Sequence, residues 1–425
     1  MSKRRKVLLA SIIALLALAG CGAGDDPAGP ALPGQLPQDA TPSPRMAIVD
    51  YRTGNLDTEA AERYARAELV VLESTYLWSW PRNTGFVASV KALNPDTRVL
   101  GYVLAKNSWT TWGDEPDSDP IANPYGWDWY QATRPYWCFT TTGDTLMDWP
   151  LQVVLDITNP ACRRAMIEVL LKWRREGENP VDGFFWDYFA NSLWIAPAVD
   201  ATVDGEPDLD GDGIGHFEDA DERQVFRDAQ TALVLETRAA FGDDFIQIFN
   251  GGRAAGDSNF AALGDGMFYE LFPTVGFWGG PRMALALDPA RTNNLYAARG
   301  WPRTRNGGPW LILSNPTSVS WWDSDWQPVQ FNLGDLNRVV ALLTGATACY
   351  HEPPYVQYGW PAYEPALGAP LGGVVCSGDT LTRDFAGGRV QLIMRSGDGA
   401  LPFDYEITEG DTVVQALRFP DYDSR

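Results

Sequence analysis

The chain has 425 residues, of which 45% are hydrophobic, and a formal net charge of -22 at pH 7. This length is sufficient for one large barrel with an appendage, or for two domains. The strong negative charge disfavours nucleic acid and anionic membranes as partners, but it does not select among neutral or cationic substrates.

The first 21 residues have the pattern of a bacterial lipoprotein signal. Residues 3–6 are all basic, and Val7–Ala19 form an apolar run that is too short for a permanent membrane span. Leu18–Cys21 (Leu-Ala-Gly-Cys) resembles a lipobox, which predicts cleavage before Cys21 and acylation of its thiol. The alternative is a secretory signal with an incidental cysteine. We therefore expect an extracytoplasmic protein that a lipid anchors to the bacterial membrane.

Residues 22–44 are rich in Gly, Pro, Ala and Asp, which predicts a flexible tether. Beyond them, short apolar runs alternate with helical patterns, as in βα units. The pattern predicts an α/β fold, a TIM (β/α)8 barrel over residues 45–373, followed by a small β element over residues 374–425. The eight expected strands are Met46–Tyr51, Leu69–Leu72, Arg98–Leu104, Gln152–Leu155, Val181–Trp186, Phe245–Phe249, Gly266–Tyr269 and Trp310–Leu313.

Helices are expected between these strands, and two connections are too long for ordinary βα loops. Pro160 follows Asn159 and fits the first position of a helix, where proline is favoured. Ala105–Pro150 is a long insertion rich in Trp and Tyr, and Asn191–Ala220 is a second one. The other expected helices begin near Asp57 or span Gly85–Leu93, Asp221–Phe241 and about Gly334–Thr347.

Four expected strands end near a carboxylate: Glu73, Asp156, Asp187 and Glu270. In a parallel barrel the carboxyl ends of the strands form one mouth, where catalytic side chains gather. Glycoside hydrolysis requires two carboxyl groups, and apolar surroundings raise a carboxyl pKa, which suits a general acid. Asp187 and Glu270 both follow aromatic strands, so we predict them as the pair, with Glu270 as the acid and Asp187 as the nucleophile or base. Asp156 also fits the alternative of a helix cap, because a helix follows it at once.

The many aromatic residues support a carbohydrate substrate, because flat rings match the apolar faces of sugars. The alternative is that the tryptophans simply pack the insertion. Residues expected to contact substrate are Glu73, Asp156, Asn250, Trp109, Trp112, Trp186, Tyr188, Tyr269 and Asn315.

Four segments carry a resemblance to a known family. They are Asp156–Pro160, Val181–Asp187, Leu367–Gly372 and Thr382–Val390. Over roughly residues 46–396 the chain resembles the hypothetical glycosyl hydrolases of TIM-barrel type that are related to endo-α-1,4-polygalactosaminidase. The resemblance implies a carboxylate on the fifth strand, which Asp187 matches, and an acid on a late strand, for which Glu270 is the match.

The second insertion contains a pattern typical of calcium loops. Asp208, Asp210 and Asp212 alternate, Gly213 takes the sixth position, and the Ile214 carbonyl takes the seventh. Asp219 stands at the twelfth position, where a bidentate glutamate is usual. We predict a structural Ca²⁺ site here and no cofactor for catalysis. The alternative is a solvated acidic loop.

The cysteines and histidines bear on two further questions, the disulfide pairing and the class of hydrolase. With Cys21 acylated, four cysteines remain and permit three pairings, of which we favour Cys138–Cys162 and Cys349–Cys376 because each closes a local loop. With only two histidines and no Gly-x-Ser-x-Gly motif, a Ser-His-Asp hydrolase has little support.

Together these patterns predict a monomeric glycoside hydrolase that acts on a poly- or oligosaccharide without a nucleic-acid partner. One alternative is a non-catalytic, surface glycan-binding lipoprotein on the same barrel, which turnover by the purified protein would exclude. A third is a metal-dependent hydrolase or esterase, which would be sensitive to chelators.

Overall fold

The computed structural model describes residues 45–50, 56–79, 83–113, 123–149, 151–189, 193, 195, 205–250, 263–269, 310–314, 337–352, 367–377, 380–394 and 403–418. The predicted signal, tether and Cys21 lie outside these residues, as do Glu270 and Asn315.

The eight barrel strands are joined in the closed order β1-β13-β12-β11-β10-β8-β3-β2. They are β1 (Arg45–Asp50), β2 (Leu69–Glu73), β3 (Arg98–Leu104), β8 (Gly183–Asp187), β10 (Ile246–Asn250), β11 (Gly266–Tyr269), β12 (Trp310–Ser314) and β13 (Thr347–Glu352). The paired strands run parallel, for example β2 with β3 and β3 with β8. The predicted α/β TIM barrel is therefore confirmed.

The chain divides into two compact units. The first includes Tyr51–Asp265 and holds β2, β3, β8 and β10. Of the described residues, the second unit includes 45–50 and those from Gly266 onward, and it holds β1, β11, β12 and β13.

Two strand predictions were wrong. The expected fourth strand is β7 (Gln152–Val154), which pairs antiparallel with β4 (Asn107–Trp109) and β6 (Met147–Trp149) in a separate three-stranded sheet. Its apolar run is buried, but hydrophobicity alone does not distinguish a barrel strand from a buried strand of an insertion. The missing barrel strand is β13, whose mixed sequence Thr-Ala-Cys-Tyr-His-Glu lacks a strand signal. Asp187 therefore ends the fourth barrel strand, not the fifth.

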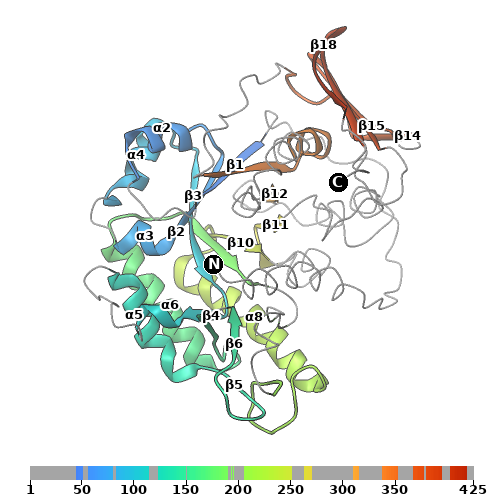
Figure 1. Cartoon of the computed structure of the whole chain (residues 1–425). Helices are drawn as coiled ribbons and strands as arrows, with labels where there is room; N and C mark the ends of the chain where they lie inside the picture. Colours follow the sequence, from blue (N-terminus) through green and yellow to red (C-terminus); the bar gives the residue numbers. More distant parts are fainter. Residues whose placement is uncertain are drawn as a thin grey trace, which may run out of the picture. The chain divides into compact units, whose positions relative to one another are not determined.

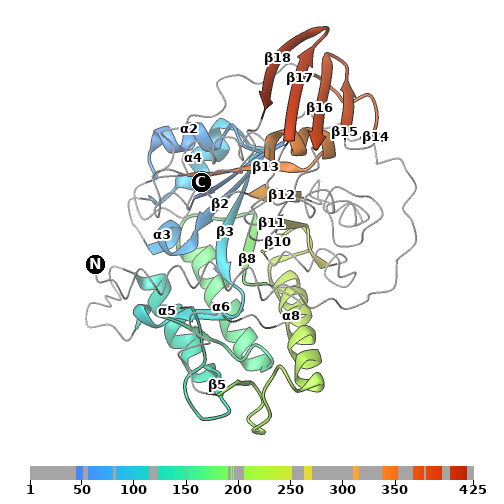
Figure 2. The same ribbon diagram turned by 45° about the vertical axis from the view of Figure 1, so that its right-hand side comes forward.

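The helices of the first unit follow the expected capping signals. Asp57 caps α2 (Thr58–Tyr64), and Asn159 caps α6 (Pro160–Glu176), with Pro160 at its start. The other predicted helices of this unit are α4 (Phe86–Leu93) and α8 (Ala220–Phe241). Not predicted were α3 (Ser74–Ser79), α5 (Pro124–Thr133), the 3-10 turns Thr110–Trp112 and Arg134–Tyr136, and the strand pair β5 (Phe139–Thr140) and β9 (Pro207–Asp208). Figures 1 and 2 show α5 beside α6.

The aromatic residues of β8 point alternately to two faces. Phe184 packs against Phe241 and Phe245 at ring-centroid distances of 5.1 and 4.7 Å. Trp186 donates from Nε1 to Gln247 Oε1 at 3.1 Å, and Gln247 in turn donates to the Val234 carbonyl of α8. This face is covered by α8, so the alternate residues Phe185 and Asp187 point inward. The register of the strands aligns Phe185 with Tyr102 of β3, and Tyr102 with Glu73 of β2.

The second unit ends in an antiparallel sheet, as predicted for the β element (Figure 2). Its strands are β14 (Val375–Ser377), β15 (Thr380–Phe385), β16 (Gly388–Met394), β17 (Phe403–Glu409) and β18 (Thr412–Arg418). Residues 337–344 of this unit are helical. The buried Arg383 of β15 donates from Nη1 to the carbonyls of Leu342 and Leu343 at 3.0 and 3.2 Å, and so ties the sheet to the end of that helix. Among the helices that the structure describes, none combines the length and hydropathy needed to cross a membrane.

Candidate active site

Asp187 lies at the carboxyl end of β8, and three donors converge on its half-buried carboxylate. The Tyr102 hydroxyl donates a short hydrogen bond to Oδ2. The amide of Asn250, which ends β10, donates to Oδ1 at 2.7 Å, and the Tyr188 backbone N–H donates to Oδ1 at 2.9 Å. Three consecutive barrel strands therefore fix the position of this carboxylate.

Tyr188 owes its contact with Asp187 to an unusual backbone conformation. Its φ angle is 58°, in the left-handed region that costs a non-glycine residue on the order of 1 kcal/mol or more. This turn directs the Tyr188 N–H to Asp187, while the ring lies 5.2 Å from the Nζ of Lys106. Such strain immediately after a polar strand end is typical of functional sites.

Opposing effects act on the pKa of Asp187. Burial raises this pKa above its usual value, and the nearby charge of Asp148 raises it further. The hydrogen bonds from Tyr102, Tyr188 and Asn250 favour the anion and limit the rise. The site thus holds a carboxylate whose charge depends on fixed donors.

Glu73 is the second titratable group of this mouth. It ends β2, and burial raises its pKa to about 7, with a further contribution from the charge of Asp187. Thr75 opposes this rise, because its N–H and hydroxyl donate to Glu73 Oε1 at 3.2 and 2.9 Å. At neutral pH a substantial fraction of Glu73 therefore carries a proton.

A buried ion pair lies beside Asp187. Lys106 Nζ binds Asp148 Oδ2, and the two side chains are only 1% and 0% exposed. The Asn107 amide also donates to Asp148 Oδ2 at 2.7 Å. Lys106 thus places a positive charge on Asp148, 5.2 Å from the centre of the Tyr188 ring.

Two predicted substrate contacts stay accessible. Trp109 and Trp112 of the aromatic insertion are partly exposed, and the Trp112 ring lies 6.1 Å from that of Tyr125. Most other aromatic residues of the insertion pack around α5, as the alternative interpretation expected.

The other predicted site residues have different positions. Trp186 is 0% exposed and faces α8, so the prediction that it binds substrate was wrong. Asp156 Oδ1 accepts hydrogen bonds from Thr158 and Asn159, and Asn159 itself caps α6. Asp156 thus shapes the entry to α6, close to the capping alternative. Tyr269 ends β11 and is only 2% exposed. The partnership of Asp187 with Glu270 stays a prediction, since Glu270 lies outside the described residues.

Sequence patterns missed three residues of this site. Tyr102 sits inside β3, where a tyrosine reads as an ordinary strand residue. Lys106 follows the apolar run of β3, and a lysine directly after a buried strand was the available signal. Asp148 lies on β6 of the insertion and carried no recognisable motif.

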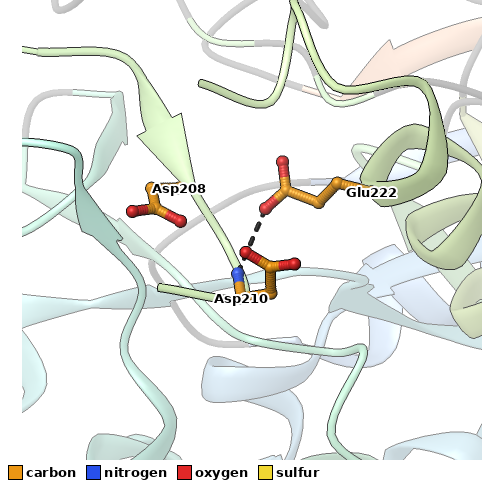
Figure 3. Close-up of side chains that lie close together, drawn as sticks. All are labelled: Asp208, Asp210 and Glu222. Atoms are coloured by element: carbon orange, nitrogen blue, oxygen red, sulfur yellow. Dashed lines mark hydrogen bonds between the residues drawn. The ribbon is translucent and has the colours of Figure 1, made fainter. Parts of the chain in front are cut away.

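The predicted calcium loop forms a second acidic cluster, also in the first unit. The carboxylate oxygens of Asp208, Asp210 and Glu222 lie within 4.8 Å of one another (Figure 3), as do those of Asp210, Asp212 and Asp219. Asp219 also caps α8, and Ile214 is exposed. Glu222 was not predicted, because it stands beyond the twelfth position. Its Oε1 accepts from the N–H groups of Leu209 and Asp210, and its Oε2 contacts His216 Nδ1 at 2.9 Å.

The predicted disulfides are absent from this structure. Cys138, Cys162 and Cys349 are buried thiols that form no disulfide bond. Burial raises the pKa of each above its usual value, because a thiolate would be poorly solvated there. Cys162 contacts Met166 Sδ at 4.0 Å, so its sulfur packs as an apolar group.

Comparison with known proteins gives one family match. The family model described as hypothetical glycosyl hydrolase family 15 matches residues 91–389. No curated protein matches the chain.

Several solved structures are similar to the chain. Ega3 of Aspergillus fumigatus, in complex with galactosamine, is 14% identical and covers 68% of this chain and 82% of its own, with a TM-score of 0.33. Amy13B of Eubacterium rectale is 9% identical, with coverages of 85% and 87% and a TM-score of 0.47. The cyclic alpha-maltosyl-(1→6)-maltose hydrolase from Arthrobacter globiformis is 13% identical, with coverages of 91% and 96% and a TM-score of 0.43.

Proposed function

This chain belongs to hypothetical glycosyl hydrolase family 15, and from that membership we propose that it cleaves O-glycosidic bonds of a poly- or oligosaccharide with two carboxyl groups. The observation that carries the proposal is the Asp187 carboxylate, held by three donors at the carboxyl end of a barrel strand. Such an oriented and partly buried carboxylate suits attack on the anomeric carbon or activation of a water molecule.

The proposal assigns Asp187 as nucleophile or base, and Glu270 is the candidate that the sequence predicts for the acid. Donors from Tyr102, Tyr188 and Asn250 support the first role, because they stabilise the anion that either reaction requires. The place of Glu270, directly after β11, supports the second role. Partly exposed Trp109 and Trp112 would stack against sugar rings.

The test measures reducing ends released by the purified protein from a panel of polysaccharides. Turnover is expected on at least one polysaccharide, with a loss on the order of a thousandfold for Asp187→Asn. Asp182→Asn is the matched control, because Asp182 lies just before the other end of β8, where it accepts from the Val99 N–H and pairs with Lys91. Absence of turnover on every glycan, or full activity of Asp187→Asn, would contradict the proposal.

The proposed location is extracytoplasmic, with a lipid on Cys21. The basic and apolar segments before Leu18–Cys21 support it. In a bacterial host, Cys21→Ser should move the protein from the membrane fraction to the soluble fraction. Unchanged fractionation would contradict the anchor.

The proposed structural ion is Ca²⁺ in the loop Asp208–Asp219. The alternating spacing of the aspartates and the convergence of their oxygens support it. The described residues add Glu222 as a candidate ligand. An ion here would hold the start of α8 to the second insertion.

A further inference from the structure

Glu73 and Asp187 lie on the same inner face of the first unit. In the strand register, Glu73 of β2 is aligned with Tyr102 of β3, and Tyr102 with Phe185 of β8. Asp187 follows Phe185 by two residues on β8 and so points to the same face. Tyr102 lies between the two acids and donates to Asp187. Two strand spacings and the two-residue offset separate the backbone positions of the two acids by about 12 Å, and both side chains extend from there into the barrel. The charge of Asp187 acts on Glu73, so the two carboxyls belong to one site, with room between them for a water molecule beside the sugar.

Thr75 sets the orientation of the Glu73 carboxyl. Both donors of Thr75 reach Oε1, so that oxygen is occupied as an acceptor. Among the residues that the structure describes, Oε2 of Glu73 has no hydrogen-bond partner. A proton on Glu73 is therefore best placed on Oε2, which stays available to an oxygen of a ligand.

The surroundings of Glu73 also favour its protonated form. Burial is the largest cause that raises its pKa to about 7, and the charge of Asp187 adds to it. The charge of Glu73 in turn contributes to the raised pKa values of Tyr76 and Tyr125, so these phenols lie nearby. Tyr125 contacts Trp112, which connects this carboxyl to the aromatic insertion.

We propose that Glu73 is a further catalytic carboxyl of this enzyme and the general acid that protonates the leaving glycosidic oxygen. The inference rests on the proposed function and differs from it in assigning the acid to β2 rather than to Glu270. Asp187 then acts as the base.

The step balances as a single displacement. A water molecule attacks the anomeric carbon and gives one proton to Asp187, while the bond from that carbon to the glycosidic oxygen breaks. The electron pair of this bond goes to the leaving oxygen, which takes the proton from Glu73 Oε2. The products are a free sugar and an alcohol, and solvent then returns a proton to Glu73 and removes one from Asp187.

The first experiment compares leaving groups. The probes are the polysaccharide that the wild-type enzyme cleaves and the glycosyl fluoride of the released sugar, since fluoride leaves without protonation. Glu73→Gln should lose between about 10²- and 10⁴-fold on the polysaccharide and stay within about tenfold of wild type on the fluoride. Asp187→Asn should lose both activities. Glu62→Gln, an exposed residue of α2, is the matched control and should keep both.

The second experiment leaves Glu73 in place. In the wild type, kcat/KM should fall as the pH rises past about 7, because Glu73 loses its proton there. Thr75→Val removes the hydroxyl that lowers the pKa of Glu73, so this alkaline limb should move to higher pH. A purely structural role of Glu73 would leave the position of the limb unchanged.

The outcomes separate the two proposals. Full activity of Glu73→Gln on the polysaccharide, equal losses on both probes, or an unmoved alkaline limb in Thr75→Val would each overturn the assignment of Glu73. A leaving-group difference in Glu270→Gln but not in Glu73→Gln would overturn it in favour of Glu270. A wild-type protein without turnover on any glycan would contradict the proposed function itself.

Discussion

The barrel mouth and the acidic loop both bury a glutamate near other acidic groups, but they arrange these groups differently. Each holds a glutamate whose pKa is raised to about 7, chiefly by burial: Glu73 in the mouth and Glu222 in the loop. In the loop, carboxylate oxygens lie within 4.8 Å of one another. In the mouth, Glu73 and Asp187 are separated by an intervening strand.

The hydrogen-bond donors to the acidic groups also differ between the loop and the mouth. Glu222 accepts from backbone N–H groups of its own loop, and these fix an oxygen cluster of the kind that hard cations bind. Asp187 accepts from side chains of two neighbouring strands, and a buried lysine lies nearby. Closely spaced carboxylates suit a shared cation, whereas separated ones suit exchange of protons with a ligand.

The largest expected effect concerns the buried ion pair of the mouth. Lys106→Met should lower the free energy of unfolding by about 3–5 kcal/mol, because it leaves the buried Asp148 uncompensated. Lys172→Met is the control, since Lys172 pairs with Asp128 at a 42% exposed position and should cost less than about 1 kcal/mol. Denaturant unfolding measures both, and equal losses would show that burial of the pair contributes nothing.

Calcium should stabilise the loop without affecting the mouth. At a calcium concentration about a hundredfold above its dissociation constant, the folded state gains about 2.7 kcal/mol, seen as a melting temperature several degrees higher. Asp210→Asn should abolish this gain, because Asp210 belongs to both oxygen clusters. Asp228→Asn, on the exposed side of α8, should retain it. A melting temperature unmoved by calcium and by chelator would contradict the site.

Removal of one donor should change the pH dependence of the mouth. Tyr102→Phe deletes the hydrogen bond that favours the Asp187 anion, at a cost of roughly 2 kcal/mol, or tens-fold in kcat/KM at pH 5. The pKa of Asp187 should rise further, so the acidic limb of the pH–rate profile should move to higher pH. An unchanged acidic limb would show that Asp187 does not govern it.

The smallest effect is on stability. The folded-state pKa of Glu73 is raised from 4.5 to about 7, so its contribution is fully present below pH 4.5 and is lost as the pH rises through 7. Relative to the wild type, Glu73→Gln should therefore raise the free energy of unfolding more at pH 8 than at pH 5. The difference should be roughly 1 kcal/mol after allowance for partial exposure. Melting temperatures at both pH values measure this, with Glu62→Gln as the reference. The same shift in both variants would contradict a raised pKa of Glu73.

Strand ends were easier to predict than side-chain partners. The apolar and aromatic run before Asp187 identified β8, and Asn159 with Pro160 identified the start of α6, because both signals are local. Gln152–Leu155 was wrongly predicted as a barrel strand, because its antiparallel partners lie within the insertion. The barrel strand β13 was not predicted, because its sequence mixes polar and apolar residues. Strand pairing is decided by tertiary contacts, which a local pattern does not contain.

In the candidate site, too, local sequence patterns identified residues at strand ends but not the partners that tertiary contacts bring to them. Asp187 and Glu73 were found from their positions after strands. Tyr102 belongs to the site only because the β3–β8 register brings its hydroxyl to Asp187. Trp186 was assigned to the wrong face because alternation along β8 does not itself reveal which face α8 covers. Glu222 joins the acidic loop through the first turn of a helix, which no calcium-loop template includes.

The tie made by Arg383 limits how this chain can be recombined. Its guanidinium donates hydrogen bonds to the carbonyls of Leu342, Leu343 and Gly372, and the residue is only 4% exposed. A gene shortened before β14 would remove that donor and leave the Leu342 and Leu343 oxygens to find others. Domain shuffling that treats the C-terminal sheet as an exchangeable module would therefore separate a helix from its own cap. A fusion junction placed after β18 keeps the two together.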